Sequence, residues 1–168
     1  IAAFDEFKNQ TQSDFKLLLV GAVYASEGDV IKTIEKSHVE RFFLTSDTTK
    51  GALNIDINIE IPVALDNEVI LDSIKNVIVS NLFGADYVTT NKDSLVSKFV
   101  ENLKKEYKLT NEPILNELDS TSKYSFNNDH VLEGYSLLSD ENIYSYGISR
   151  YVFMGGAHGL NNLVYLNF

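Results

Sequence analysis

The segment from Leu53 to Val63 alternates strictly between apolar residues and either polar residues or proline. Its apolar positions are Leu53, Ile55, Ile57, Ile59, Ile61 and Val63. Successive side chains of a strand point to opposite faces of a sheet, so this period of two predicts a long strand with one buried and one solvated face. Proline has no N–H to donate, which indicates that Pro62 lies at a sheet edge or where the chain leaves the sheet.

Two amphipathic helices are predicted after this strand. The first has Asp66 or Asn67 as its N-cap and Gly84 as its stop. Its apolar stripe consists of Ile70, Leu71, Ile74, Val77, Ile78 and Leu82. The second runs from about Ser94 to Lys108, where apolar residues recur every three or four positions and the other face is charged.

After Pro113 the pattern changes to short segments rich in Tyr, Phe, Val and Leu. These segments cover 122–127, 130–138, 142–153 and 162–168, with turn residues between them. The spacing predicts an antiparallel meander of three consecutive hairpins. The expected fold class is therefore α+β, with an antiparallel sheet made of this meander plus the strand near 53–63, and helices packed on one face.

The predicted elements follow an N-terminal segment, residues 1–49, of uncertain assignment. The apolar spacing in residues 1–26 suits one or two amphipathic helices, and residues 38–44 suit either strand or helix. The longest apolar run, 17–25, is about half of the roughly 20 residues that a bilayer span needs. We therefore expect it in the core and predict no transmembrane span in this chain.

Charge and cysteine content exclude several functions. Fourteen basic and 24 acidic residues give a net charge of -10, which would repel nucleic acid at long range. The same field would attract a cationic partner, although acidity most often serves solubility alone. The chain has no cysteine, so disulfides, thiolate zinc sites and cysteine nucleophiles are excluded.

The most distinctive motif is the glycine-rich run Met154-Gly155-Gly156-Ala157-His158-Gly159. Three glycines permit positive φ angles and close backbone approach, and the amides of such a turn can bind an anion. The spacing favours a tight hairpin in which His158 hydrogen-bonds a carbonyl, ahead of ligand contact and well ahead of catalysis.

Other chemical motifs are weaker. His38 and His130 have no metal-ligand spacing, so no metal or cofactor is predicted. Asp129 beside His130, with Glu133 nearby, resembles a set of general acid–base residues. The Asn-Asn-Asp context instead favours a role for Asp129 in capping a turn. No nucleophile elbow or nucleotide-binding glycine motif occurs, and no catalytic residue is assigned.

Aromatic residues are concentrated on the predicted meander, at Tyr135, Tyr144, Tyr146, Tyr151, Phe153 and Tyr165. In a strand, 144 and 146 face one way while 151 and 153 face the other. Exposed tyrosines on a sheet suit the binding of carbohydrate or protein surfaces, and cross-strand packing is the more frequent alternative.

The run from Ile143 to Gly159, with the closing Tyr165-Leu166-Asn167-Phe168, resembles the domain of unknown function found in the peptidoglycan deacetylase PdaC and the anti-sigma factor RsiV. Members of that family show an aromatic strand, then Tyr-x-Gly-Gly-Ala-His, then a strand ending in Asn-Phe-Asp. The resemblance covers roughly residues 50–168. The sequence departs from the family pattern at Met154, and it ends where the family continues into a second domain.

The resemblance implies an exported or lipid-anchored bacterial protein of the cell envelope, with a companion C-terminal domain in the native protein. In the deacetylase the chemistry resides in a separate domain, and in RsiV this region with its companion binds lysozyme. The leading hypothesis is thus a non-catalytic extracytoplasmic module that binds a cell-wall glycan or a protein such as lysozyme. Its expected contact residues are Tyr146, Tyr151, Met154, Gly155, Gly156, Ala157, His158 and Gly159.

Two alternatives stay open from the sequence. One is a cell-wall hydrolase or deacetylase-associated domain in which His158 works beside Asp129 or Glu133. The other is a structural scaffold in which the glycine motif is only a well-made turn.

Overall fold

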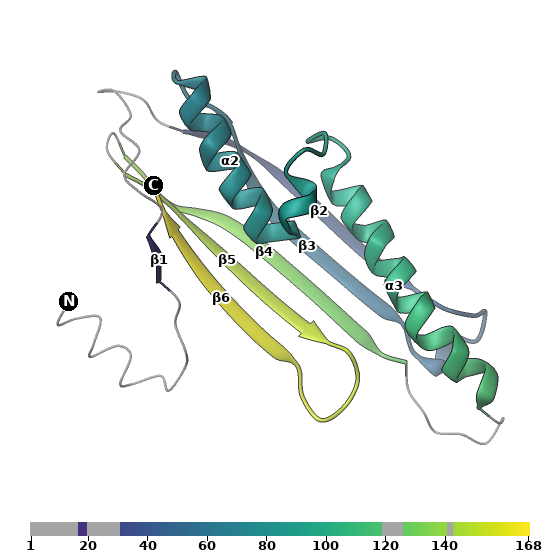
Figure 1. Cartoon of the computed structure of the whole chain (residues 1–168). Helices are drawn as coiled ribbons and strands as arrows, with labels where there is room; N and C mark the ends of the chain where they lie inside the picture. Colours follow the sequence, from purple (N-terminus) through teal and green to yellow (C-terminus); the bar gives the residue numbers. More distant parts are fainter. Residues whose placement is uncertain (1–16, 20–30, 119–125, 141–142) are drawn as a thin grey trace, which may run out of the picture.

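The computed structural model describes residues 17–19, 31–118, 126–140 and 143–168, and shows one sheet with helices on one of its faces (Figure 1). The strands are β1 (Leu17–Leu19), β2 (Lys32–Phe42), β3 (Leu53–Ala64), β4 (Asn128–Ser139), β5 (Tyr144–Phe153) and β6 (Leu160–Asn167). The helices are α2 (Glu68–Phe83) and α3 (Leu95–Glu117), with short 3-10 turns η1 (Thr48–Lys50) and η2 (Ala85–Tyr87). No helix in the described ranges is long and apolar enough to cross a membrane.

The strand order across the sheet is β1-β6-β5-β4-β3-β2. Strands β2 and β3, β4 and β5, and β5 and β6 pair antiparallel, whereas β3 and β4, and β1 and β6, pair parallel. A parallel pair needs a crossover connection, and α2, η2 and α3 supply it between β3 and β4. The predicted α+β class is confirmed, with a mostly antiparallel sheet.

Strand β3 confirms the period-two prediction. Its odd-numbered residues from Leu53 to Ile61 are at most 1% exposed and lie under the helices, while Asp56 and Asn58 are exposed on the other face. The pairing of β3 with β4 ends at Ile59, so Pro62 has no partner in β4 on that side. On the other side Pro62 pairs with Thr33 of β2, next to an irregularity in the register. Proline therefore occupies a stretch of β3 with a paired strand on one side only, as its missing donor requires.

Helix α2 has the predicted ends. The Asn67 side chain accepts a hydrogen bond from the Ile70 amide at 3.2 Å, and Gly84 follows the last turn with a φ of 108°. Helix α3 starts after Ser94 as predicted, but the expected end near Lys108 was wrong, because the helix continues through Pro113 to Glu117. Proline costs the hydrogen bond to the Leu109 carbonyl. Water can reach that turn, since Leu109 is 67% exposed, and packing of Ile114 and Leu115 on the core holds the last turns in place.

Two expectations for the N-terminal segment are settled. Residues Leu17–Leu19 form the short strand β1 parallel to β6, so the predicted helix is wrong there, and the rest of 1–26 lies outside the described residues. Residues 38–42 belong to strand β2, which decides the ambiguity between strand and helix.

Among the described residues, the meander contains three strands and two hairpins. Phe126 and Asn127, predicted to belong to a further strand, are not in one, and the rest of that predicted segment, 122–125, lies outside the described residues. The expected turn at 127–129 was also wrong, since Asn128 and Asp129 begin β4 and pair with Leu53 and Asn54. A parallel neighbour supplied by a distant segment stabilises these polar residues in an extended conformation.

The core lies between the sheet and the two helices, and Tyr146 is at its centre. The Tyr146 side chain is fully buried, and its hydroxyl donates to the Glu60 carbonyl at 2.6 Å. Burial raises the pKa of Tyr146, so the hydroxyl stays protonated and able to donate. A Cβ at Gly134 would overlap the Tyr146 hydroxyl, which explains the glycine within β4.

Candidate functional site

The face of the sheet opposite the helices carries no helix in the part of the chain that the structure describes (Figure 1). Strand pairing aligns outward-pointing residues on it in two rows. One row joins Arg41 on β2, Asn54 on β3 and Asp129 on β4. The next row consists of Val39, Asp56, Val131 and Tyr151, from β2, β3, β4 and β5. Four strands thus contribute to one continuous surface.

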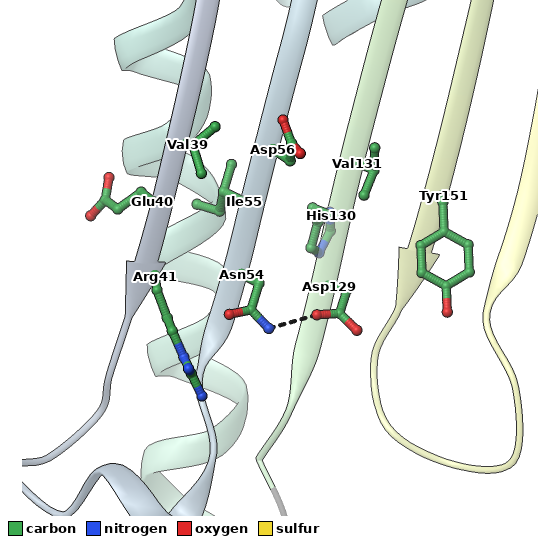
Figure 2. Close-up of a pocket in the computed structure, with 10 residues that line it drawn as sticks. All are labelled: Val39, Glu40, Arg41, Asn54, Ile55, Asp56, Asp129, His130, Val131 and Tyr151. Atoms are coloured by element: carbon green, nitrogen blue, oxygen red, sulfur yellow. Dashed lines mark hydrogen bonds between the residues drawn. The ribbon is translucent and has the colours of Figure 1, made fainter.

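A groove with a volume of about 490 Å³ lies along these two rows (Figure 2). We call it the sheet groove. Its apolar walls come from Val39, which is 78% exposed, together with Val131 and Tyr151. Polar groups at one end include Asn54, whose side-chain amide donates to Asp129 at 2.7 Å. The groove therefore combines an apolar platform with fixed hydrogen-bonding groups.

Three further lining residues, Glu40, Ile55 and His130, have side chains on the helix side, as their strand pairing requires. Glu40 accepts a hydrogen bond from the Lys104 ammonium at 3.0 Å, which lowers the pKa of its carboxyl group. Burial lowers the pKa of His130, which favours its neutral form. These groups support the groove from behind.

A second hollow of about 240 Å³ lies further along the same face. It is lined by Glu35, Asn58, Glu60, Glu133, Gly134 and Tyr135, and we call it the acidic hollow. One carboxylate oxygen of Glu60 accepts from the Ser136 amide at 3.1 Å, which fixes that side chain. Arg41 is the one cationic residue among those lining the two hollows.

Each hollow contains a tyrosine whose ring lies against a glycine of a neighbouring segment. A Cβ at Gly159 would overlap the ring of Tyr151, and a Cβ at Gly147 would overlap that of Tyr135. Both rings are only partly buried. The glycines thus leave the space in which each ring lies close to the backbone, and the rest of each ring is available to the hollow.

This contact explains part of the glycine motif in the β5–β6 loop. Gly155 and Gly156 have φ angles of 85° and 98°, and a Cβ at either would meet no atom within 4 Å, so the backbone conformation alone requires glycine there. Gly159 is required instead for its approach to Tyr151. Met154 is 73% exposed, and His158 is exposed with no hydrogen bond to its ring within the described ranges.

The predicted contact residues therefore separate into three groups. Tyr151 lines the sheet groove, and the loop from Met154 to Gly159 adjoins it through the Tyr151–Gly159 contact. Tyr146, by contrast, is a core residue on the helix side and can affect a surface only indirectly.

The acidic residues weighed in the sequence also have defined places. The turn-capping role expected of Asp129 was wrong, because Asp129 lies in β4 and accepts from Asn54. Glu133 lies in the acidic hollow. Among the described residues, no group of three or more His, Asp or Glu side chains is placed to hold a metal ion.

Sequence reasoning missed Val39, Arg41, Asn54, Asp56 and Val131. They meet Tyr151 only because β3 pairs with β2 on one side and with the distant β4 on the other. One signal was present: the polar positions of the alternating segment predict a solvated sheet face, and Asn54 and Asp56 occupy two of them.

The sequence matches a protein family described as deacetylase PdaC over residues 48–161. Among solved structures it is similar to a DUF3298 family member from Bacteroides fragilis, with 25% identity and a TM-score of 0.72, covering 85% of this chain and 56% of that one. A DUF3298 protein from Pseudomonas aeruginosa gives 13% identity and a TM-score of 0.47, covering 82% and 51%. The chain thus spans little more than half the length of these structures. No curated protein matches it.

Proposed function

This chain belongs to the deacetylase PdaC family, and from that starting point we propose that it is a non-catalytic binding domain that holds an oligosaccharide on the uncovered face of its sheet. The observation that carries the proposal is the sheet groove, with Tyr151 beside the Asn54–Asp129 pair. An aromatic ring offers a large contact area to the apolar face of a sugar at little entropic cost. Carboxylate and amide groups at the rim hydrogen-bond hydroxyl groups.

Pre-organisation supports this role. The Tyr151 ring lies against the Gly159 backbone, and the Asn54–Asp129 hydrogen bond links two polar side chains, so little side-chain freedom is lost when a ligand binds. All these groups lie on strands or are held against one, which keeps their spacing constant.

The groove is better suited to binding than to catalysis. Its lining residues include no serine, threonine or lysine, and the chain has no cysteine. Asp56 is exposed to solvent. A general acid or base works best in a site from which water is excluded, and an open sheet face does not provide one.

We further propose that the domain works outside the cytoplasm, on cell-wall glycan, as part of a longer envelope protein. The family resemblance supports this location. The oligosaccharide is the ligand that the groove favours, and a protein ligand is the alternative that the binding experiment distinguishes.

The test is isothermal titration of the intact chain with soluble peptidoglycan fragments. Wild type should bind, and Tyr151→Ala should weaken binding by about tenfold, which corresponds to about 1.4 kcal/mol. Tyr151→Phe keeps the ring and should retain most of the affinity. Leu109→Ala, at an exposed position on the helix side, is the control and should bind as wild type does.

Binding of lysozyme but of no glycan fragment would replace the oligosaccharide by a protein ligand. Release of soluble products from the fragments by the purified chain would refute the non-catalytic assignment. Loss of binding in Leu109→Ala equal to that in Tyr151→Ala would locate the site elsewhere.

A further inference from the structure

Resting on the proposed function, we infer that the ligand is a positively charged oligosaccharide of amino sugars, which extends across both hollows of the uncovered sheet face. Its ring faces would pack on Tyr151 and Tyr135, and its ammonium groups would pair with the carboxylates around them.

The two hollows lie along one line on the same face. Val131 is opposite Tyr151, and Tyr135 is four residues further along β4, opposite Gly147. At about 3.3 Å per residue the two tyrosines are about 13 Å apart along the strand. A ligand that contacts both rings must therefore be extended, as an oligomer of several sugar units is.

The charge of this surface is strongly negative. The carboxylates that face the two hollows are Glu35, Asp56, Glu60, Asp129 and Glu133, against the single cation Arg41. Arg41 lies at one end and stacks on the Phe43 ring at 5.1 Å, leaving the centre of the face without a positive group among the lining residues. Such a surface is complementary to a cation and repels an acidic ligand.

Asp56 and Glu133 are the carboxylates best placed for this pairing. Both are exposed, and within the described residues neither makes a hydrogen bond or an ion pair. Glu60 and Asp129 are each partly satisfied, by Ser136 and Asn54 respectively. An ammonium group that donates to a carboxylate forms a charge-assisted hydrogen bond, roughly twice as strong as a neutral one.

A basic peptide is the competing cationic ligand, and the backbone of the sheet disfavours it. Extended peptides bind to sheets mainly through main-chain hydrogen bonds at a free edge. In the centre of this face β3 and β4 have paired neighbours on both sides, so their N–H and C=O groups are already used. A sugar brings its own hydroxyl and ammonium donors to the side chains, and needs no backbone partner.

The experiment compares three probes by titration against the intact chain: a glucosamine hexamer, an N-acetylglucosamine hexamer and hexalysine. At low salt, and at a pH at which the sugar amine is protonated, the glucosamine hexamer should bind about tenfold more tightly than the acetylated hexamer. Raising the salt from about 0.01 M to about 0.5 M should remove most of this preference, since exposed charges are then screened.

Asp56→Asn and Glu133→Gln should each weaken binding of the glucosamine hexamer several-fold more than they weaken binding of the acetylated hexamer. Tyr135→Ala should weaken binding of both hexamers. Glu112→Gln, which removes an exposed carboxylate on α3 at the helix side, is the matched control and should alter neither.

Equal affinity for the two hexamers would overturn this inference and leave the proposed function standing. If neither hexamer binds, and peptidoglycan fragments do not bind either, the proposed function itself fails. Tighter binding of hexalysine than of glucosamine would assign the face to a basic peptide and also overturn the inference.

Discussion

Tyr151 and Tyr135 on the uncovered face each lie where a neighbouring glycine leaves space for the ring. Tyr151 lies on Gly159 and Tyr135 lies on Gly147, and in both cases a Cβ on the glycine would overlap the tyrosine ring. The rings differ in the element that supplies the glycine, which is the β5–β6 loop for Tyr151 and β5 itself for Tyr135. The orientation of the two rings on the uncovered face therefore depends on the glycines beside them.

Gly159→Ala should displace the Tyr151 ring. We expect it to weaken glycan binding about as much as Tyr151→Ala does and to lower the free energy of unfolding by about 1–3 kcal/mol through overpacking. Gly155→Ala is the matched control, because its φ of 85° brings strain of about 1–2 kcal/mol without a contact to Tyr151.

Urea unfolding followed by tyrosine fluorescence measures both changes, since the chain has no tryptophan. Titration then separates the two variants. If Gly155→Ala loses as much affinity as Gly159→Ala, the loop conformation rather than the ring contact controls the groove.

At the scale of elements, Arg150 connects the end of α2 to the sheet. Its guanidinium group donates to the carbonyls of Asn81 and Leu82 at 3.0 and 2.8 Å, which are among the last carbonyls of the helix and have no partner within it. A cation at a helix C-terminus is also favoured by the helix dipole. Burial lowers the pKa of Arg150, but an arginine side chain remains charged.

Arg150→Met should therefore leave these carbonyls without a donor and lower the free energy of unfolding by about 1–3 kcal/mol. Arg150→Lys should recover part of this, because one ammonium group cannot reproduce the two guanidinium bonds in the same geometry. The control Arg41→Met removes a cation from an exposed position and should change stability by less than about 0.5 kcal/mol. Equal destabilisation by the two methionine variants in a urea titration would contradict the assigned role.

Elements with a strong local pattern could be predicted from the sequence. Strand β3 and helix α2 carry an uninterrupted period and clear end signals such as Asn67 and Gly84. The end of α3 could not, because core packing of Ile114 and Leu115 outweighs the local cost of Pro113. Strand β1 could not be predicted from its local sequence either, because its conformation depends on pairing with β6.

The candidate site was predictable only on its β5 side. Tyr151 and the glycine loop stand out as a local motif, whereas Val39, Asp56 and Val131 meet them through pairings between segments far apart in the sequence. Parallel pairing of β3 with β4 leaves no turn signal, because two helices separate the strands.

At the scale of the whole molecule, the centre of the sheet should be the most stable part. Strand β3 has paired neighbours on both sides and isoleucines buried under both helices, so amides of Ile55, Ile57 and Ile59 should exchange with solvent slowest. Strand β6 should be less protected. The described residues of β1 pair only with Tyr165 to Asn167, at one end of β6. The amides within 160–164 that point away from β5 should therefore exchange at least about tenfold faster than those of β3. Hydrogen exchange measured by NMR tests this, and slow exchange throughout β6 would show that its outer edge is covered.

The alternation in β3 has a consequence for how such a domain can diverge. Odd-numbered residues from Leu53 to Ile61 enter the core and even-numbered residues from Asn54 to Glu60 reach the uncovered face, so core packing and surface chemistry are set by alternating positions of one segment. Mutations at Asn54, Asp56 or Asn58 change the uncovered face and leave the isoleucine packing untouched. Substitutions can therefore alter the uncovered face one position at a time, while selection for folding acts on the positions in between.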